Sequence, residues 1–312
     1  ELLADLVQNP RFDPAEMERE RSVILEEIAA AVDDPEDVLF ERFQERFWEG
    51  HAMARPILGT VESVSAMDAG MLHEYLDGLR AGDLVVAAAG NLEHEALEDL
   101  VARWLPDIRP GSAPLGREAP ACRSHVEVLE RDGLEQTHLY VACEAVPADS
   151  PERFTLNLLN TLLGGRVSSR LFQSIREEHG RAYSVYSSAS GYSDSGFLMV
   201  NASTRPENGS RVIELALEEL RRLRHEPLEA EELQRMKDHL KGGVMLGLEN
   251  TFARMANLAR QQIAFGRIFG LDEILDGIDA VSAEQVQALA SEMFAEERLS
   301  VGAIARPEAA EA

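Results

Sequence analysis

Two glutamates on one predicted helix are the residues best placed to do chemistry. The helix begins at Asp13, because Asp before Pro with Glu16 close behind is typical of a capped helix start. With 3.6 residues per turn, Glu20 and Glu27 fall on the apolar stripe, whereas Glu26 falls on the other side. The apolar members of that stripe are Met17, Ile24, Ile28 and Ala31.

Carboxylates on an apolar helix face require an explanation. Burying an unpaired carboxylate is costly, so Glu20 and Glu27 would need a cation, a metal or a hydrogen-bond network as partner. The alternative is that the face is wide and both side chains reach water. The periodicity leaves both interpretations open.

The helix that carries these two glutamates belongs to a chain with a predicted linker and a weak internal sequence repeat. Residues 106–122 contain four prolines and two glycines, which predicts a linker between residues 1–105 and 123–312. An internal repeat at an offset of about 216 residues relates Gly50 to Gly266, and two short strings to later counterparts. The paired strings are Val64–Ala66 with Val281–Ala283, and Leu84–Val86 with Leu299–Val301. Each copy should run from a long helix and a glycine loop through shorter helices to a short strand.

The first copy of the repeat is predicted to be incomplete. Counting back from Arg123 by the repeat offset places its start about 90 residues before Glu1. The chain also begins inside a helical apolar pattern with no cap. We therefore expect an N-terminal portion to be absent from this sequence.

The second half has a clear order of elements. The pattern predicts strands at 126–129 and 137–143, a helix at 152–163, a glycine loop, a helix at 169–178 and a hairpin of 183–190 with 197–203. Two helices and a final strand should follow. Strands separated by helices, with antiparallel neighbours, favour an α+β layer architecture over a doubly wound sheet.

Composition excludes several classes of function. The chain has 30 Lys and Arg against 56 Asp and Glu, a net charge of −26, so a general nucleic-acid binder is excluded. The two cysteines, Cys122 and Cys143, provide no disulfide framework, and a reducing, cytoplasmic location is expected. No apolar run approaches the roughly 20 residues that cross a bilayer, so no membrane insertion is expected. The charge would suit basic peptides, or reflect an acidic proteome.

Three long segments resemble one family of enzymes. The segments at 17–28 and 50–67, MERERSVILEEI and GHAMARPILGTVESVSAM, resemble the pitrilysin/insulinase family of zinc peptidases, specifically its mitochondrial-processing-peptidase-like bacterial members. The segment at 162–187, LLGGRVSSRLFQSIREEHGRAYSVYS, resembles the glycine-rich loop and Arg/Tyr segment of the same family. This resemblance implies two related α+β halves that face each other across a chamber for unfolded or extended peptides.

The resemblance also implies roles for individual residues. It places the distal zinc ligand at Glu27 and a supporting, second-shell acidic residue at Glu20, so Zn²⁺ is the expected cofactor. It assigns Arg176 and Tyr183 to hydrogen bonds with the substrate backbone near the scissile bond. The loop at Gly164 and Gly165 is then expected to be a hinge or a substrate loop, not a phosphate cradle.

One part of the family pattern is missing. None of the eight histidines forms the H-x-x-E-H motif that supplies the other two zinc ligands and the general base, so the zinc site is incomplete in this chain. Either the motif lies in the absent portion and the protein is a zinc-dependent endopeptidase, or the protein is a non-catalytic peptide-binding or scaffold subunit. A homodimer, or a heterodimer with a related subunit, is a further expectation. At the repeat offset, Glu27 aligns with Gly243 and Glu20 with Met236, so any metal site should belong to the first half.

Overall fold

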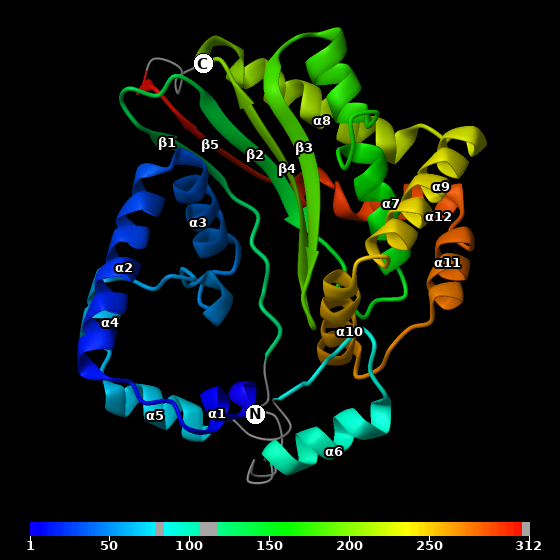
Figure 1. The fold of residues 1–312 in the computed structure, drawn as a ribbon. Helices are drawn as coiled ribbons and strands as arrows, with labels where there is room; N and C mark the ends of the chain where they lie inside the picture. Colours follow the sequence, from blue (N-terminus) through cyan, green and yellow to red (C-terminus); the bar gives the residue numbers. More distant parts are fainter. Residues whose placement is uncertain (79–83, 106–117, 308–312) are drawn as a thin grey trace. The chain divides into compact units, whose positions relative to one another are not determined.

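The chain forms two compact units, each built from separate stretches of sequence. A computed structural model describes residues 1–78, 84–105 and 118–307 (Figure 1). The helical unit comprises residues 1–32, 56–118 and 247–266, and the sheet unit comprises 33–55, 119–246 and 267–312. The chain therefore crosses between units within both predicted halves. Most of the predicted linker, residues 106–117, lies outside the described residues, and residues 118–122 have no regular structure.

The sheet unit is built on five strands in the order β1-β5-β2-β4-β3. β1 and β5 are parallel, and the other neighbouring pairs are antiparallel. The predicted strands, the hairpin and the final strand are confirmed, and so is the α+β class. The strands are β1 (Val126–Glu130), β2 (Thr137–Glu144), β3 (Ala182–Gly191), β4 (Gly196–Thr204) and β5 (Ser300–Ala305).

One face of the sheet is covered by helices. Alternate residues of β2, Leu139, Val141 and Cys143, point into this apolar layer, as the two-residue period of a strand requires. Five helices lie between β4 and β5 where the sequence pattern predicted two, and two of them begin at the caps Asn250 and Ser282. The helices packed on this face are α7 (Arg153–Leu163), α8 (Gly209–His225), α9 (Ala230–Gly247), α11 (Leu271–Asp279) and α12 (Ala283–Met293).

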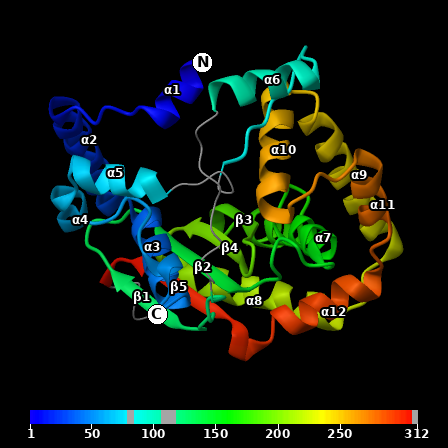
Figure 2. The same cartoon turned by 90° about the horizontal axis from the view of Figure 1, so that it is seen from below.

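The opposite face is covered by α3 (Pro35–Phe47), which lies across β5 and β2 (Figure 2). Asp34 caps this helix by accepting hydrogen bonds from Glu36 N and Asp37 N at 2.8 and 3.2 Å. One turn apart, Leu39, Phe43 and Phe47 make a buried stripe against the sheet. Burial of each aromatic side chain stabilises the fold by about 2 kcal/mol, so α3 is part of the core of the sheet unit. The side chains that it meets include Tyr140, Phe197 and Met199.

The helical unit has few buried residues. Its α1 is tied to α6 by a hydrogen bond of 2.6 Å from Gln8 Nε2 to Trp104 O. The strand predicted to end the first copy of the repeat, at Leu84–Val86, is wrong, because residues 84–89 have no regular structure. Its helices are α1 (Leu2–Gln8), α2 (Pro14–Asp33), α4 (Val61–Ala66), α5 (Ala69–Gly78), α6 (His94–Trp104) and α10 (Thr251–Phe265). None of the helices in the described ranges is long and apolar enough to cross a membrane.

Two positions of the internal repeat have matching local structure. Gly50 and Gly266 both follow a helix, and both have left-handed backbones, with φ of +84° and +66°. The Val-Ser-Ala strings match less well, because Val64–Ala66 closes α4 whereas Ser282 caps α12. In the first copy, the helix equivalent to α12 is α5, and Asp68 accepts a hydrogen bond from its first turn.

Candidate functional site

The helix α2 begins as its sequence predicts. Asp13 Oδ1 accepts hydrogen bonds from Ala15 N at 2.9 Å and Glu16 N at 3.4 Å, and Pro14 is the first helical residue. The Glu16 side chain forms an ion pair with Arg19 at 2.6 Å. The register of the carboxylates along this helix is therefore set by Asp13.

The half-buried stripe of α2 differs from the predicted stripe. Glu20 and Glu27 are exposed, as is Glu26, so both candidate carboxylates reach water in this structure. The face that the helix buries is displaced by about one position, which puts the two glutamates at its edge. Its half-buried members are Met17, Arg21, Ile24, Leu25, Ile28 and Ala31.

The sequence analysis missed Arg21, which takes a central place in this stripe. Its guanidinium donates hydrogen bonds to Val64 O and, at 2.8 Å, to Met67 O. These carbonyls end α4, and carbonyls at a helix C-terminus attract cations. The spacing of positions 17, 21, 24, 28 and 31 could have identified Arg21 as an inward-facing residue.

Glu20 lines a cavity of about 710 Å³ in the helical unit, together with Arg21, Val64 and Leu72. Within residues 1–78, 84–105 and 118–307, no three His, Cys, Asp or Glu side chains are placed to hold a metal ion. A zinc site requires three protein ligands or more. The described residues therefore do not make a zinc site by themselves, and Glu27 is at most one ligand of such a site.

In the sheet unit, Tyr183 is set apart by an irregularity of its strand. Ala182 pairs with Thr204 and Ser184 with Ser203, so Tyr183 is an extra residue in β3. Such a bulge turns a side chain away from the regular alternation and is common beside binding sites. The Tyr183 side chain is 75% exposed and lines a cavity of about 350 Å³.

Arg176 lies on η3 (Phe172–Glu178), a turn of π-helix where the sequence pattern predicted an ordinary helix. Its guanidinium stacks over the Phe172 ring at 4.8 Å. The turn ends at Glu178, as the sequence pattern predicted, and Gly180 just beyond it has a left-handed φ of +58°. No hydrogen bond joins Arg176 to Tyr183 among the described residues, so their joint action on a substrate stays a prediction.

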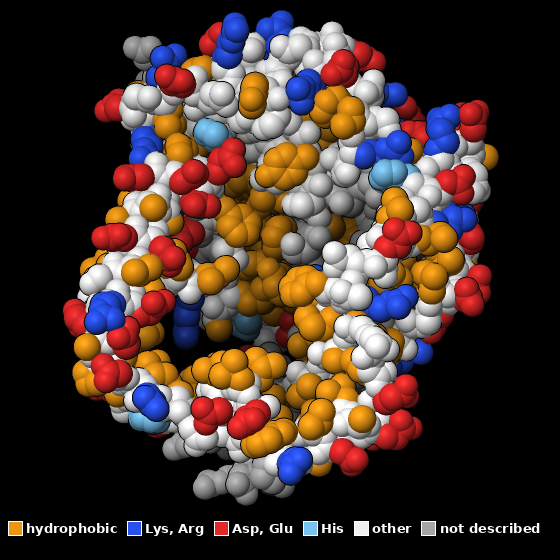
Figure 3. All heavy atoms as spheres, in the orientation of Figure 1, with side chains coloured by type: hydrophobic (Ala, Val, Ile, Leu, Met, Phe, Trp, Pro, Cys, Tyr) orange, Lys and Arg blue, Asp and Glu red, His pale blue; other side chains and the backbone are white. Residues whose placement is uncertain are grey.

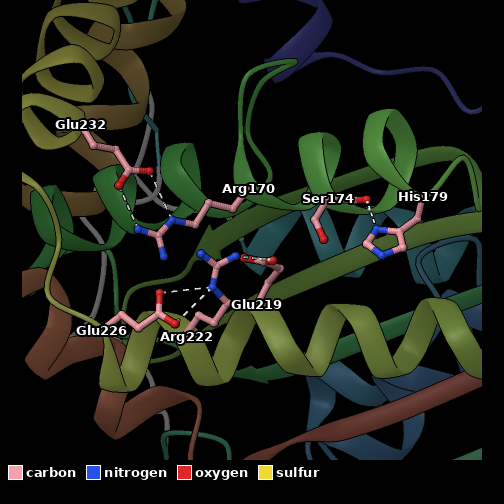
Figure 4. A network of polar contacts seen from close by, with 7 residues as sticks. All are labelled: Arg170, Ser174, His179, Glu219, Arg222, Glu226 and Glu232. Carbon is pink, nitrogen blue, oxygen red and sulfur yellow. Dashed lines mark hydrogen bonds and ion pairs between the residues drawn. The ribbon is translucent and has the colours of Figure 1, made fainter.

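Polar contacts fix the helical segment that carries Arg176 (Figure 4). Arg170 binds Glu232 of α9 through two hydrogen bonds, at 3.2 and 2.9 Å. At the other end, Ser174 O accepts hydrogen bonds from the backbone N–H of His179 at 3.2 Å and from its Nδ1 at 2.8 Å. Because a carbonyl can only accept, Nδ1 of His179 carries a proton. Both ends of the segment are therefore anchored.

The glycine loop has a packing role that the sequence did not reveal. A Cβ on Gly164 would lie 2.4 Å from Ser187 N, and one on Gly165 would lie 3.0 Å from Thr161 Cα. Ser187 N donates to Gly164 O at 3.1 Å, which holds the loop against β3. The small size of Gly164 thus permits contact with the strand, and a role in sliding substrate stays a prediction.

Hydrophobic side chains gather over the strands of the sheet beside α3 (Figure 3). Phe40 of α3, Met199 of β4 and Tyr186 of β3 line a shallow depression there, and Tyr186 is half exposed. His138 Nδ1 lies 3.0 Å from Glu36 Oε1 at its rim. This surface offers apolar contact next to polar groups, as a peptide-binding face requires.

Comparison with known proteins identifies related chains. Residues 1–61 match the sequence model of the insulinase family, peptidase family M16, and residues 72–240 match that of the peptidase M16 inactive domain. The first range contains Glu20 and Glu27, and the second contains Arg176 and Tyr183.

Relatives of known name cover nearly the whole chain. The "Uncharacterized zinc protease YmxG" of Bacillus subtilis is 33% identical over 299 residues, which are 95% of this chain and 72% of that protein. The "Uncharacterized zinc protease ML0855" of Mycobacterium leprae is 37% identical over 304 residues, 94% of this chain and 67% of that protein.

A solved structure shows the same fold. The crystal structure of a peptidase M16 inactive domain from Pseudomonas fluorescens superposes with a TM-score of 0.90 at 21% identity, over 98% of this chain and 74% of that one. A protease from Helicobacter pylori superposes with a TM-score of 0.88 at 16% identity, over 97% and 75%. At these identities the likeness concerns the fold alone.

Proposed function

The chain belongs to the M16 (insulinase) family of peptidases, and on that premise we propose that the complete protein is a zinc-dependent endopeptidase of extended peptides. The observation that carries this proposal is the pair of relatives named zinc proteases, which are 33% and 37% identical to nearly the whole chain. Glu27 lies within the range that matches the insulinase model, on a helix whose register Asp13 sets.

Each candidate residue receives one role in this proposal. Glu27 is the carboxylate ligand of zinc, and the two histidines come from an H-x-x-E-H motif that these 312 residues do not contain. Glu20 supports Glu27 from the cavity that it lines. Arg176 and Tyr183 donate hydrogen bonds to substrate carbonyl oxygens, which stabilises negative charge that develops there. The described residues do not form a zinc site by themselves.

A second candidate is a non-catalytic peptide-binding or scaffold subunit of such a peptidase. The observation that favours it is the sequence itself, in which none of the eight histidines lies in an H-x-x-E-H motif. In either case the partner would be a peptide, and a homodimer or a heterodimer with a related subunit is proposed. Sedimentation of the purified protein, alone and with a related subunit, would measure that assembly.

The zinc content of three variants of the complete protein tests the proposal. In Glu27→Gln, zinc and peptidase activity should be lost together, because a neutral amide is a poor zinc ligand. In Glu20→Gln, zinc affinity should fall by about 10- to 100-fold, as for residues that orient a ligand. Glu26→Gln is the matched control and should keep both properties, since its side chain is exposed and lies on the other side of the helix.

The outcomes separate the two candidates. A wild-type protein that binds no zinc after metal loading, yet binds peptides, would identify the non-catalytic subunit. Loss of zinc in Glu26→Gln with retention in Glu27→Gln would contradict the assigned ligand. Zinc per chain is measured by metal analysis after dialysis, so the result does not depend on knowing the natural substrate.

A further inference from the structure

The cavity beside Tyr183 is built from positively charged and neutral polar side chains. It has a volume of about 350 Å³, within the usual range for small-ligand sites, and lies where β2 and β3 begin and β4 ends. Its polar side chains are Arg181, Arg205, Gln136, Asn208, Thr204 and Tyr183, and no residue that lines it is acidic.

Both arginines of this cavity are available to a ligand. Arg181 Nη1 donates to Asn208 Oδ1, a neutral partner, at 2.8 Å. Among the described residues, neither Arg181 nor Arg205 takes part in an ion pair, whereas about half of the described arginines do. A guanidinium presents its N–H donors in a fork that matches a carboxylate.

A helix terminus adds to the positive potential. Asn208 immediately precedes α8, its side chain makes no capping hydrogen bond to the first turn, and its oxygen accepts from Arg181. The N-terminus of a helix carries about half a positive charge, which favours an anion nearby. The helix is long enough, at 17 residues, to show this effect.

The position of Tyr183 connects this cavity to a peptide. Its bulge turns one side chain out of the strand at the wall of the cavity. We propose that the cavity binds a carboxylate of the peptide substrate, either an acidic side chain or the C-terminal carboxylate, through Arg181 and Arg205. This inference rests on the proposed function and names a substrate class for it.

The high negative charge of the chain does not oppose this assignment. At physiological ionic strength, charges more than about 8 Å away are largely screened, so the nearest groups decide the local potential. Glu135, Glu178 and Glu207, which lie close in sequence to residues of the cavity, are exposed and do not line it. The charged side chains that line the cavity are therefore both positive, although the whole chain is strongly negative.

The test compares four labelled peptides of one extended sequence. Two carry three glutamates and two carry three glutamines, and each is made with a free C-terminal carboxylate and with an amide. Equilibrium binding is measured by fluorescence anisotropy with the complete protein in EDTA, so that no peptide is cleaved. We expect about tenfold tighter binding for a peptide whose carboxylate fits the cavity, and a smaller ratio at higher salt.

Three single variants locate the effect. Arg181→Gln and Arg205→Gln should each reduce the preference for the carboxylate-bearing peptide to threefold or less. The peptide with three glutamines and a C-terminal amide should bind to these variants as tightly as to the wild type. Arg211→Gln is the matched control, because Arg211 lies on α8, pairs with Glu214 and Glu218, and does not line the cavity. It removes the same charge and should keep the preference.

Each outcome bears on a different statement. If the glutamate peptides bind more tightly than the glutamine peptides, whether the C-terminus is free or amidated, the cavity binds an acidic side chain. If the peptides with a free C-terminus bind more tightly than the amidated ones, the cavity binds the C-terminal carboxylate. Equal binding of all four peptides, or a preference that Arg211→Gln abolishes equally, would overturn the carboxylate site and leave the proposed function standing. Failure of every peptide to bind would contradict both.

Discussion

Gly164 lies in direct contact with the backbone of Ser187, so close that a Cβ on the glycine would stand 2.4 Å from Ser187 N. The two residues are also joined by a hydrogen bond of 3.1 Å from Ser187 N to Gly164 O. Ser187 Oγ in turn donates to Asn160 Oδ1 at 2.7 Å. The end of α7 is thereby fixed to β3, the strand that carries Tyr183.

Replacing Gly164 by alanine should therefore destabilise the protein. In Gly164→Ala the new methyl group must push β3 and α7 apart, and overpacking of this kind costs about 1–3 kcal/mol. Chemical unfolding in urea measures the loss. Gly242→Ala is the control, because Gly242 lies inside α9 with nothing within 4 Å of a new Cβ. Alanine there should stabilise by about 0.5–1 kcal/mol, and equal destabilisation by both changes would contradict the contact.

Arg21 should be the residue that holds α2 on α4. In Arg21→Ala the carbonyls of Val64 and Met67 lose a charged donor, which costs about 1.5–3 kcal/mol. Faster amide hydrogen exchange in both helices would report the change. Arg19→Ala removes the same charge from the same helix, but Arg19 is 72% exposed, and its ion-pair partner within the described part of the chain is the exposed Glu16. Its effect should stay within about 0.5 kcal/mol, and equal exchange in both variants would refute the role of Arg21.

Local patterns in the sequence predicted the local structure well. The strands of the sheet unit follow from two-residue alternation, and the start of α2 follows from Asp13 and Pro14, because both signals depend on neighbouring residues alone. The helical breaks at Asn250 and Ser282 were missed, since a polar residue in a long helical pattern reads equally well as part of the exposed face.

Relations between distant segments could not be predicted in the same way. Nothing local reveals that α3 covers the sheet, because the partners of Phe43 are Tyr140 and Phe197, far along the chain. The bulge at Tyr183 depends on its pairing with β4, and the inward side chain of Arg21 depends on the end of α4. The surroundings of both Tyr183 and Arg21 are therefore formed by contacts between residues that lie far apart in the sequence.

Tyr183 and Arg176 should affect turnover and not metal content. If the complete protein is the proposed zinc peptidase, Tyr183→Phe and Arg176→Ala should each lower kcat/KM by about 100-fold, because each would remove a donor to the developing negative charge. Zinc per chain should stay at the wild-type value. Unchanged turnover in both variants would refute their role, and loss of zinc would show that they act through the fold. Tyr192→Phe, directly after β3, is the control and should keep turnover.

His125 should make the stability of the sheet unit depend on pH. Burial, with a smaller contribution from Arg46, lowers the pKa of its ring below the ordinary value. Its Nδ1 lies 3.3 Å from Arg123 O and its Nε2 2.8 Å from Tyr140 Oη. A carbonyl only accepts, so Nδ1 carries the proton and the Tyr140 hydroxyl donates to Nε2, an arrangement that the neutral ring alone can make.

The sign of the effect follows from which state binds the proton first. In the unfolded chain His125 has its ordinary pKa of about 6.5, so as the pH falls from 7.5 towards 5.5 the unfolded state takes up the proton and the free energy of unfolding decreases. The slope for one group is at most about 1.4 kcal/mol per pH unit. In His125→Gln this part of the decrease should vanish, whereas His94→Gln, at a side chain 77% exposed, should keep it. Urea unfolding at both pH values measures the difference, and an equal decrease in wild type and His125→Gln would show that this half-buried ring does not cause the pH dependence.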